Sequence, residues 1–313
     1  MKEKLEFYHK YEKMIKVSII IPTYNKYERL KLVLCSLENQ TYNKELFEVI
    51  IVDDGSTDDT KKITNRDYSF NLYYMRQNNN GRSAARNKGL ENATYSTLVF
   101  IDDDTVLSPY FIEEHVKQQA KAPVVAHGAI REIPYVKFFK DPSKGIFYDI
   151  FSGDLSVSRM QKYCISSADI IERFNEKIEK ASKISGHEKI IFDIFQKEYS
   201  KLYWLGFSGG NVSLPKCWIQ DIGGFDECYK TNWGCEDIDV GYRLLQKKYP
   251  FTYNMNAVNY HLDHFHLNYV EEHNIGANLF YEKFEDNNIF LLQKFVQGEI
   301  KSEEFIKRVN TKQ

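Results

Sequence analysis

Short apolar runs alternate with amphipathic segments over the first 120 residues, and this alternation constrains the fold more than any other feature. Four runs rich in β-branched and aromatic residues have the pattern of strands: "KVSIIIPTYN", "LFEVIIVDD", "NLYYMRQ" and "STLVFIDDD". Between them, "KYERLKLVLCSLENQ" and "GRSAARNKGLENA" have the pattern of helices, and "STDDTKKI" that of a capped helix start. Strands and helices that alternate at this spacing predict an α/β fold with a mostly parallel sheet flanked by helices.

Polar residues follow three of these predicted strands. They are Asn25, the pair Asp53 and Asp54, and the run Asp102 to Asp104. Ligands of parallel sheets bind at the carboxyl ends of the strands, so these residues are expected at one site. Three adjacent carboxylates repel one another, and a hard cation such as Mg²⁺ or Mn²⁺ with substrate phosphates would neutralise them. The alternative is a solvated acidic loop before a helix over 109–120, whose start Ser108 and Pro109 predict.

The segment "NNNGRSAARNKG" adds Arg82 and Arg86 near the same edge. A glycine before a helix N-terminus offers backbone N–H groups to a phosphate. The two arginines could equally be surface residues of an amphipathic helix, an alternative that is stronger for Arg86 than for Arg82. The spacing is not that of a P-loop, and no G-x-G-x-x-G follows the first strand, which disfavours an NAD-binding enzyme.

The remainder of the chain is patterned more loosely. Helices are predicted near 168–183 and 188–200 and in "EDIDVGYRLLQKKY", with a strand in "FTYNMNAVNYH" and helices in the last 40 residues. We find no internal repeat and no linker. The predicted organisation is a helical extension over 1–15, one catalytic domain over 16–270 with halves 16–120 and 121–270, and a helical segment over 271–313.

Composition excludes several classes of protein. The net charge of −2 offers no footprint for nucleic acid. Five scattered cysteines without paired spacing predict reduced thiols rather than disulfides or a zinc site. The charged N-terminal segment has no apolar signal core, and no apolar run approaches the roughly 20 residues that cross a bilayer. We therefore expect a cytoplasmic protein, and peripheral association with the inner face of the membrane and homodimerisation both stay open.

Taken together, the strand-end motifs resemble those of family 2 glycosyltransferases of the GT-A fold. The resemblance rests on "VSIIIPTYN", "EVIIVDDGSTDDT", "NNGRSAARNKG" and "LVFIDDDTVLSP". It resumes at "GFSGGNVSLPK", "GGFDE", "WGCEDIDVGYRL" and "AVNYHLDH". This second group is similar to the galactosyltransferase-type C-terminal half of β-galactosyltransferases, chondroitin-polymerase-like enzymes and polypeptide N-acetylgalactosaminyltransferases.

The resemblance implies a role for each matching residue on the donor side. A UDP-sugar would contact Pro22, Thr23, Tyr24, Asn25, Asp53, Asp54, Arg82, Asp102 and Asp103. A Mn²⁺ or Mg²⁺ ion would be bound by Asp104 and His261, with His264 and His266 as competitors for the histidine position. "HLDHFH" could instead be a zinc site, but no matching cysteine or carboxylate cluster accompanies it.

On the acceptor side, the resemblance makes Asp237 the general base of an inverting transfer, with Glu236 holding the acceptor. Trp233 would present an apolar face to a sugar ring, and Gly210 and Asn211 would line the sugar site. The helix dipole also favours acids at this position, so simple capping is an alternative for Glu236 and Asp237. Cys235 stands where many relatives have glycine, which leaves the path of this loop open.

The acceptor class stays open among a glycan, a lipid-linked saccharide, a peptide and a small molecule. Two other functions are weighed against the transferase. One is a catalytically silent module that binds a nucleotide sugar or glycan. The other is a nucleotidyltransferase, which would normally carry a glycine-rich basic loop after its first strand, and "PTYNKYERL" is not such a loop.

Overall fold

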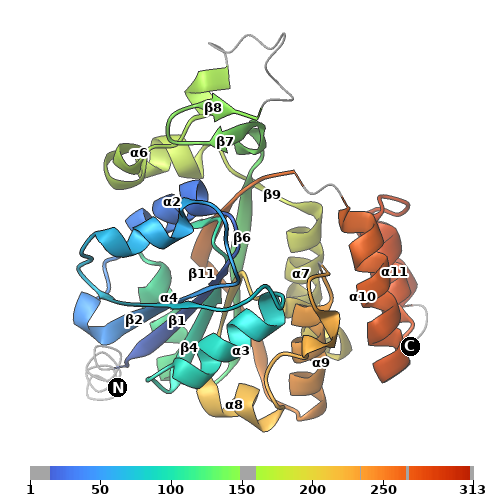
Figure 1. The fold of residues 1–313 in the computed structure, drawn as a ribbon. Coiled ribbons are helices and arrows are strands. Elements are labelled where there is room, and N and C mark those ends of the chain that lie inside the picture. The colour runs from blue at the N-terminus through green and yellow to red at the C-terminus, as the bar shows by residue number, and fades with distance from the viewer. Residues whose placement is uncertain (1–14, 149–159, 233, 266–267, 311–313) are drawn as a thin grey trace, which may run out of the picture.

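One large mixed sheet, flanked by helices on both faces, organises the chain (Figure 1). The computed structural model describes residues 15–148, 160–232, 234–265 and 268–310. The predicted N-terminal extension, Trp233 and His266 therefore lie outside the described residues, apart from residue 15. The strands are β1 (Val17–Thr23), β2 (Phe47–Asp53), β3 (Asn71–Arg76), β4 (Thr97–Ile101), β5 (Thr105–Leu107), β6 (Val125–Ile133), β7 (Phe139–Asp141), β8 (Ile146–Phe147), β9 (Lys183–Ile184), β10 (Asn211–Pro215) and β11 (Phe251–Leu262).

The helices connect these strands and extend the C-terminal half. They are α2 (Tyr27–Glu38), α3 (Arg82–Asn92), α4 (Phe111–Lys121), α6 (Ser167–Glu172), α7 (Gly186–Gln196), α8 (Lys216–Asp221), α9 (Glu236–Gln246), α10 (Tyr269–Phe284), α11 (Asn288–Val296) and α12 (Ser302–Asn310). Short 3₁₀ segments cover Lys44–Leu46, Asp59–Asn65, Pro134–Phe138, Gln161–Tyr163, Ser200–Gly206 and Glu227–Tyr229, and a π-helical turn covers Asn175–Glu179. None of the described helices is long and apolar enough to cross a membrane.

The order of strands brings the site residues to one edge of the sheet. The order is β3-β2-β1-β4-β10-β6-β11-β5, and β9 also pairs with β6. The first four strands are parallel, β10 is antiparallel to both β4 and β6, and β11 is parallel to β6. β10 runs against β4, and β6 runs against β10, so β6 and its parallel neighbour β11 run in the same direction as β4. β4 and β11 therefore end at the same edge of the sheet. The prediction of a mostly parallel α/β sheet is confirmed.

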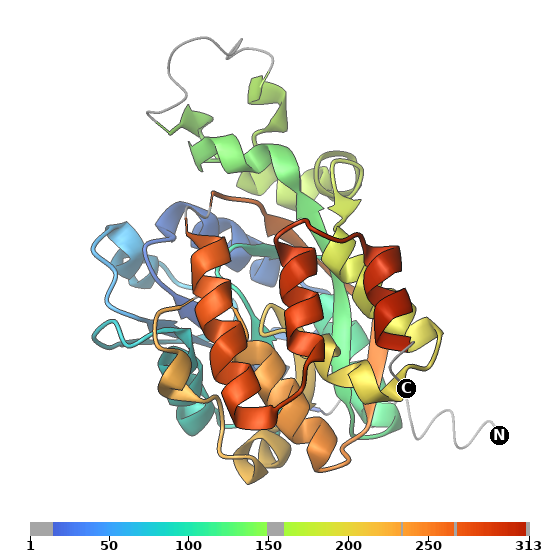
Figure 2. The ribbon, with the colours of Figure 1, turned by 90° about the vertical axis from the view of Figure 1, so that its right-hand side faces the viewer.

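Alternate residues of the buried strands serve opposite faces, which explains why these strands are apolar throughout. Ile19 and Ile21 of β1 pack in one core with residues of α2 and α4, whereas Ile20 packs in another with residues of α3, α8 and α9. A third core joins α7, α9, α10, α11 and α12, which stand as a layer beside the sheet in Figure 2.

Three local predictions need correction. The helix predicted from Pro109 begins at Phe111, and its N-cap residue is Tyr110 rather than Ser108. Ser108 contributes only its backbone carbonyl, which accepts the N–H of Phe111. "STDDTKKI" forms a 3₁₀ segment, which Asp58 caps by accepting from Thr60 N–H. The segment 168–183 is divided into α6 and the π-helical turn, and a hairpin of β7 and β8 projects with α6 beyond the sheet edge (Figure 1).

Candidate active site

A pocket of about 340 Å³ opens at the carboxyl ends of β1 and β4. It brings together ten of the residues that the sequence predicts for the donor and the metal: Pro22, Thr23, Tyr24, Asp54, Arg82, Asp102, Asp103, Asp104, His261 and His264. Gly81, the glycine expected before the helix N-terminus, also lines it, and so do Lys26, Asn79 and Thr231, which sequence reasoning missed. The edge predicted from strand ends is therefore where the pocket lies.

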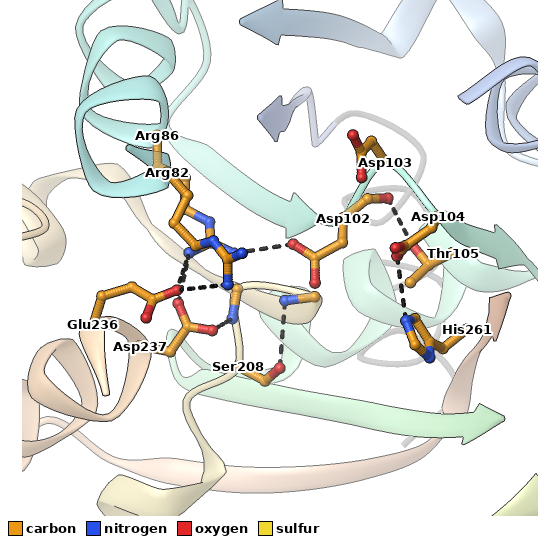
Figure 3. A network of polar contacts seen from close by, with 12 residues as sticks. Arg82, Arg86, Asp102, Asp103, Asp104, Thr105, Ser208, Glu236, Asp237 and His261 are labelled. Carbon is orange, nitrogen blue, oxygen red and sulfur yellow. Dashed lines mark hydrogen bonds and ion pairs between the residues drawn. The ribbon is translucent and has the colours of Figure 1, made fainter. Parts of the chain in front are cut away.

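Asp104, His261 and His264 form a candidate metal centre. Their ligand atoms all lie within 4.8 Å of one another. His264 Nε2 is 3.0 Å from Asp104 Oδ2. His261 Nε2 is 3.6 Å from Asp104 Oδ1, a contact drawn in Figure 3. The strand pairing explains this, because His261 of β11 is paired with Thr105 of β5, the residue after Asp104. One carboxylate and two imidazoles can bind a divalent metal ion: the carboxylate suits Mn²⁺ or Mg²⁺, and the imidazoles suit a transition metal better than Mg²⁺.

The charges around Asp104 keep its carboxylate ionised. Burial opposes its ionisation, but Lys26 and the two histidines hold the pKa of Asp104 well below its usual range. Burial lowers the pKa of His264, which favours the neutral imidazole that binds metals. Burial also favours a lower pKa at His261, but the nearby carboxylate of Asp104 has the larger effect, so the pKa of His261 is raised. Lys26 Nζ lies 2.8 Å from Asp104 Oδ2, so this lysine is part of the centre.

Three predicted nucleotide residues mainly hold loops in place. Asp53 is buried and accepts hydrogen bonds from Ser56 N–H and Tyr74 O–H, and it does not line the pocket. Asn25 also lies outside the pocket lining, because its side-chain oxygen accepts from Thr57 N–H at 2.7 Å. Asp103 lines the pocket but is largely buried, where it accepts from Tyr24 N–H.

Asp54 both lines the pocket and organises the loop before α3. Its carboxylate accepts from Gln77 Nε2 at 2.8 Å and from the backbone N–H groups of Asn80 and Gly81 at 3.0 and 2.8 Å. These bonds fix Gly81, the N-cap residue of α3, beside the pocket. Of the two aspartates at the end of β2, Asp54 lines the pocket and Asp53 does not.

Arg86 lies at the centre of a cluster of carboxylates beside the pocket (Figure 3). Its Nη1 is 2.8 Å from Asp237 and 3.4 Å from Glu236, and its Nη2 is 3.0 Å from Asp102. The side chain is 2% exposed, so the prediction of a surface arginine is wrong. Arg82 also reaches Glu236 at 3.4 Å, from a half-exposed position on the pocket wall.

Asp237, the predicted base, is held at the N-terminus of α9. Its second oxygen accepts from Gly209 N–H at 2.9 Å, at the start of the turn that leads into β10. Burial raises the pKa of Asp237 to about 7 against the effect of Arg86, and the charges of Glu236 and Asp102 add to the increase. A carboxylate with a pKa near neutrality is suited to accept a proton at physiological pH. Capping alone does not account for these bonds.

Gly209 and Gly210 are glycines because side chains approach them closely. A Cβ at Gly209 would lie 2.4 Å from the guanidinium carbon of Arg86, and one at Gly210 would lie 2.7 Å from Asp102 Oδ2. The predicted role of Asn211 in binding sugar needs correction. Asn211 is fully buried, donates to the carbonyls of Ala129 and Ala257, and contacts His115 through its side-chain oxygen.

The loop before α9 takes a path that is strained at Cys235. Cys235 is the N-cap residue of α9 and has φ 73°, in the left-handed region that favours glycine. Its side chain is buried in the core shared by α9 and α10. A Cβ at Gly276 of α10 would lie 2.7 Å from the carbonyl of Gly234, so α10 lies directly against this loop. The cysteine therefore follows the path that a glycine would take.

Comparisons with known proteins identify the family of the chain. The family model described as glycosyl transferase family 2 matches residues 18–181, and the model described as N-terminal domain of galactosyltransferase matches residues 191–281. Chondroitin synthase from Escherichia coli is 31% identical over 78% of this chain and 34% of its own length. Validoxylamine A glucosyltransferase from Streptomyces hygroscopicus subsp. jinggangensis is 29% identical over 75% of this chain and 53% of its own. The chain thus spans about a third to a half of these relatives.

A solved structure shares the fold. Mannosyltransferase PcManGT from Pyrobaculum calidifontis, in complex with GDP-Man and Mn²⁺, superposes with a TM-score of 0.53 at 14% identity, covering 95% of this chain and 72% of that one. The α/β architecture is thus that of the GT-A fold. Since the first family model spans more than half of the chain, the chain belongs to glycosyl transferase family 2.

Proposed function

We propose that the chain transfers a hexose or N-acetylhexosamine from a UDP-sugar to a hydroxyl group of a glycan acceptor, with inversion and with Asp237 as the general base. The observation that carries this proposal is the division of the site into two charged centres. Asp104, His261 and His264 line the pocket, whereas Asp237 and Glu236 lie beside it and are joined to Asp102 through Arg86.

On the donor side, the pocket would hold the nucleotide between the loop after β1 and the N-terminus of α3. Asp104, His261 and His264 would bind Mn²⁺ or Mg²⁺, which when bound neutralises charge on the diphosphate leaving group. Arg82 and the N-terminus of α3 add positive potential to the same wall. A hexosyl donor agrees with the names of two relatives, chondroitin synthase and validoxylamine A glucosyltransferase.

On the acceptor side, Asp237 would take the proton of the attacking hydroxyl. Arg86 and Gly209 N–H fix both of its oxygens, and the raised pKa favours proton uptake. Glu236 would orient the acceptor, because its Oε2 atom is buried without a hydrogen-bond partner among the described residues. A base on the side of the sugar opposite the leaving diphosphate would give a single displacement. A positioned base contributes about 10²- to 10⁴-fold in rate.

The test is release of nucleoside diphosphate from a panel of UDP-sugars and GDP-mannose, with Mn²⁺ and with chelator. We expect slow hydrolysis of one UDP-sugar, dependent on the metal and lost in Asp104→Ala. With an acceptor, Asp237→Asn should lower transfer by about 10²- to 10⁴-fold and leave UDP binding unchanged. A silent binding module would release nothing from any donor. Absence of metal-dependent UDP binding would refute the proposal.

A further inference from the structure

Lys26 places a positive charge inside the candidate metal centre. It ends the loop after β1, directly before α2, and its Nζ lies 2.8 Å from Asp104 Oδ2. His264 Nε2 contacts the same oxygen at 3.0 Å. The side chain of Lys26 is 23% exposed and lines the pocket, so it borders both the metal centre and the space for the nucleotide.

A divalent ion at Asp104 conflicts with this position of Lys26. A protonated lysine has three donors and no lone pair, so it cannot serve as a metal ligand. Its positive charge would lie within a few ångströms of an ion bound to the same carboxylate, and the low dielectric of this largely buried site would make their repulsion strong. An ion therefore has to displace the ammonium from Asp104, and metal binding in the empty pocket is weakened by the loss of that ion pair.

The displaced ammonium needs another anion nearby. The lysine stem has four carbons and can swing while its backbone stays at the start of α2. Three other acids line the pocket, and each already has a partner: Asp103 is largely buried and accepts from Tyr24 N–H, Asp54 accepts from Gly81 N–H, and Asp102 pairs with Arg86. A diphosphate in the pocket would be more exposed and more highly charged than any of these carboxylates. It would also lie in the pocket that Lys26 lines.

We propose that Lys26 pairs with Asp104 in the empty enzyme and moves to the donor diphosphate when donor and metal bind. This deepens the proposed function and rests on it. Lys26 then weakens metal binding in the absence of nucleotide and strengthens nucleotide binding in the presence of metal. The two ligands become coupled, and the coupling is reciprocal: UDP tightens Mn²⁺ by the same factor by which Mn²⁺ tightens UDP.

The test measures Mn²⁺ binding from the signal of free Mn²⁺ in electron paramagnetic resonance, with and without UDP. For the wild type we expect UDP to lower the Kd for Mn²⁺ by about 5- to 150-fold, the usual range of such couplings. Lys26→Met should bind Mn²⁺ alone more tightly than the wild type and should show a smaller effect of UDP. Lys31→Met is the matched control, because Lys31 lies on the same helix and pairs with Glu28.

Each outcome has a defined meaning. If Lys26→Met binds Mn²⁺ alone no more tightly than the wild type, the inference is overturned. The variant could instead bind Mn²⁺ alone more tightly while its UDP affinity with Mn²⁺ equals that of the wild type. The Lys26 ammonium of the wild type would then move to Asp103 and not to the diphosphate, and the inference would also be overturned. Lys26→Gln repeats the test should the methionine variant not fold. Wild-type protein that binds no UDP at any Mn²⁺ concentration would overturn the proposed function itself, which separates the two failures.

Discussion

Replacing Arg86 with methionine removes the guanidinium from between three carboxylates while keeping an unbranched side chain of similar reach. In the native protein this cation contacts Asp237 at 2.8 Å and Asp102 at 3.0 Å, over the ring of Phe225 at 5.3 Å. Without it, the charges of Asp237 and Glu236 face each other in a buried site. Arg86 touches no reacting atom in our proposal, so we assign it a positioning role.

The substitution should lower the stability of the protein and raise the pKa of Asp237. Removing one partner of a buried ion pair costs about 3–5 kcal/mol, because the remaining charge stays buried and unpaired. At about 2–4 °C per kcal/mol for large domains, the apparent Tm should fall on the order of 10 °C at pH 8. Arg86 also opposes the upward shift of the pKa of Asp237, which is about 7 in the native protein. Its loss should therefore move this pKa above 7.

The assay is kcat against pH together with thermal unfolding against pH. For a base that acts ionised, the acid limb of the profile should move to higher pH, so activity lost at pH 7 should partly return at pH 9. The folded variant binds more protons than the wild type, so the difference in Tm should shrink as pH falls. Arg173→Met, at a half-exposed pair with Asp169, is the control and should change little. An Arg86→Met protein with the wild-type Tm and pH profile would refute the reasoning.

Three further predictions follow from the same contacts. Wild-type kcat should rise with pH through about 7 and level off above it, because burial raises the pKa of Asp237 and only the ionised form accepts a proton; a flat profile from pH 5 to 8 would count against this base. Gly209→Ala should destabilise by about 1–3 kcal/mol and lower kcat, because the new Cβ would displace Arg86; Gly223→Asn serves as the activity control, since no atom lies near that position and asparagine tolerates its positive φ of 81° better than most side chains. Asn211→Ala should cost about 1–3 kcal/mol in denaturant unfolding by leaving buried carbonyls unpaired, with KM for donor and acceptor unchanged; a selective rise in KM would restore its role in sugar binding.

The edge of the sheet that carries the site could be predicted because it depends on the order of strands and helices. Asp104 follows one strand and His261 ends another, and parallel strands of one sheet bring such ends together. The pattern required no knowledge of side-chain contacts. The strand order thus predicted where the polar residues gather, whereas the choice of Asp104 and His261 as metal ligands came from the family resemblance, which did not decide which of the candidate histidines contact Asp104.

The roles of Arg86 and Lys26 could not be predicted in the same way. Arg86 lies on a helix whose buried face includes small residues, so its hydrophobic pattern does not reveal that the arginine points inward. Its partners Glu236 and Asp237 are 150 residues away in sequence, and only the packing of α9 beside α3 places them there. The signal available was the excess of acids at the start of α9, which calls for a buried cation.

Asn211 and Asp53 show the opposite error. Both stand at strand ends in a pattern that suits ligand binding, yet both are buried and bonded within the protein. At such positions a polar side chain satisfies either a ligand or the backbone of its neighbours, and the sequence pattern is the same in the two cases. Burial decides between them, and burial depends on residues from distant segments.

The contact of α10 with the loop before Cys235 bears on how this chain can be shortened or recombined. The predicted boundary at residue 270 falls within α10, yet Gly276 packs against Gly234 and Cys235, and Phe280 fills the core beneath α9. A chain cut at 270 would lose the wall against which the loop carrying Asp237 rests. Exchange of the C-terminal helices between related enzymes should therefore succeed only when the loop 234–237 is exchanged with them.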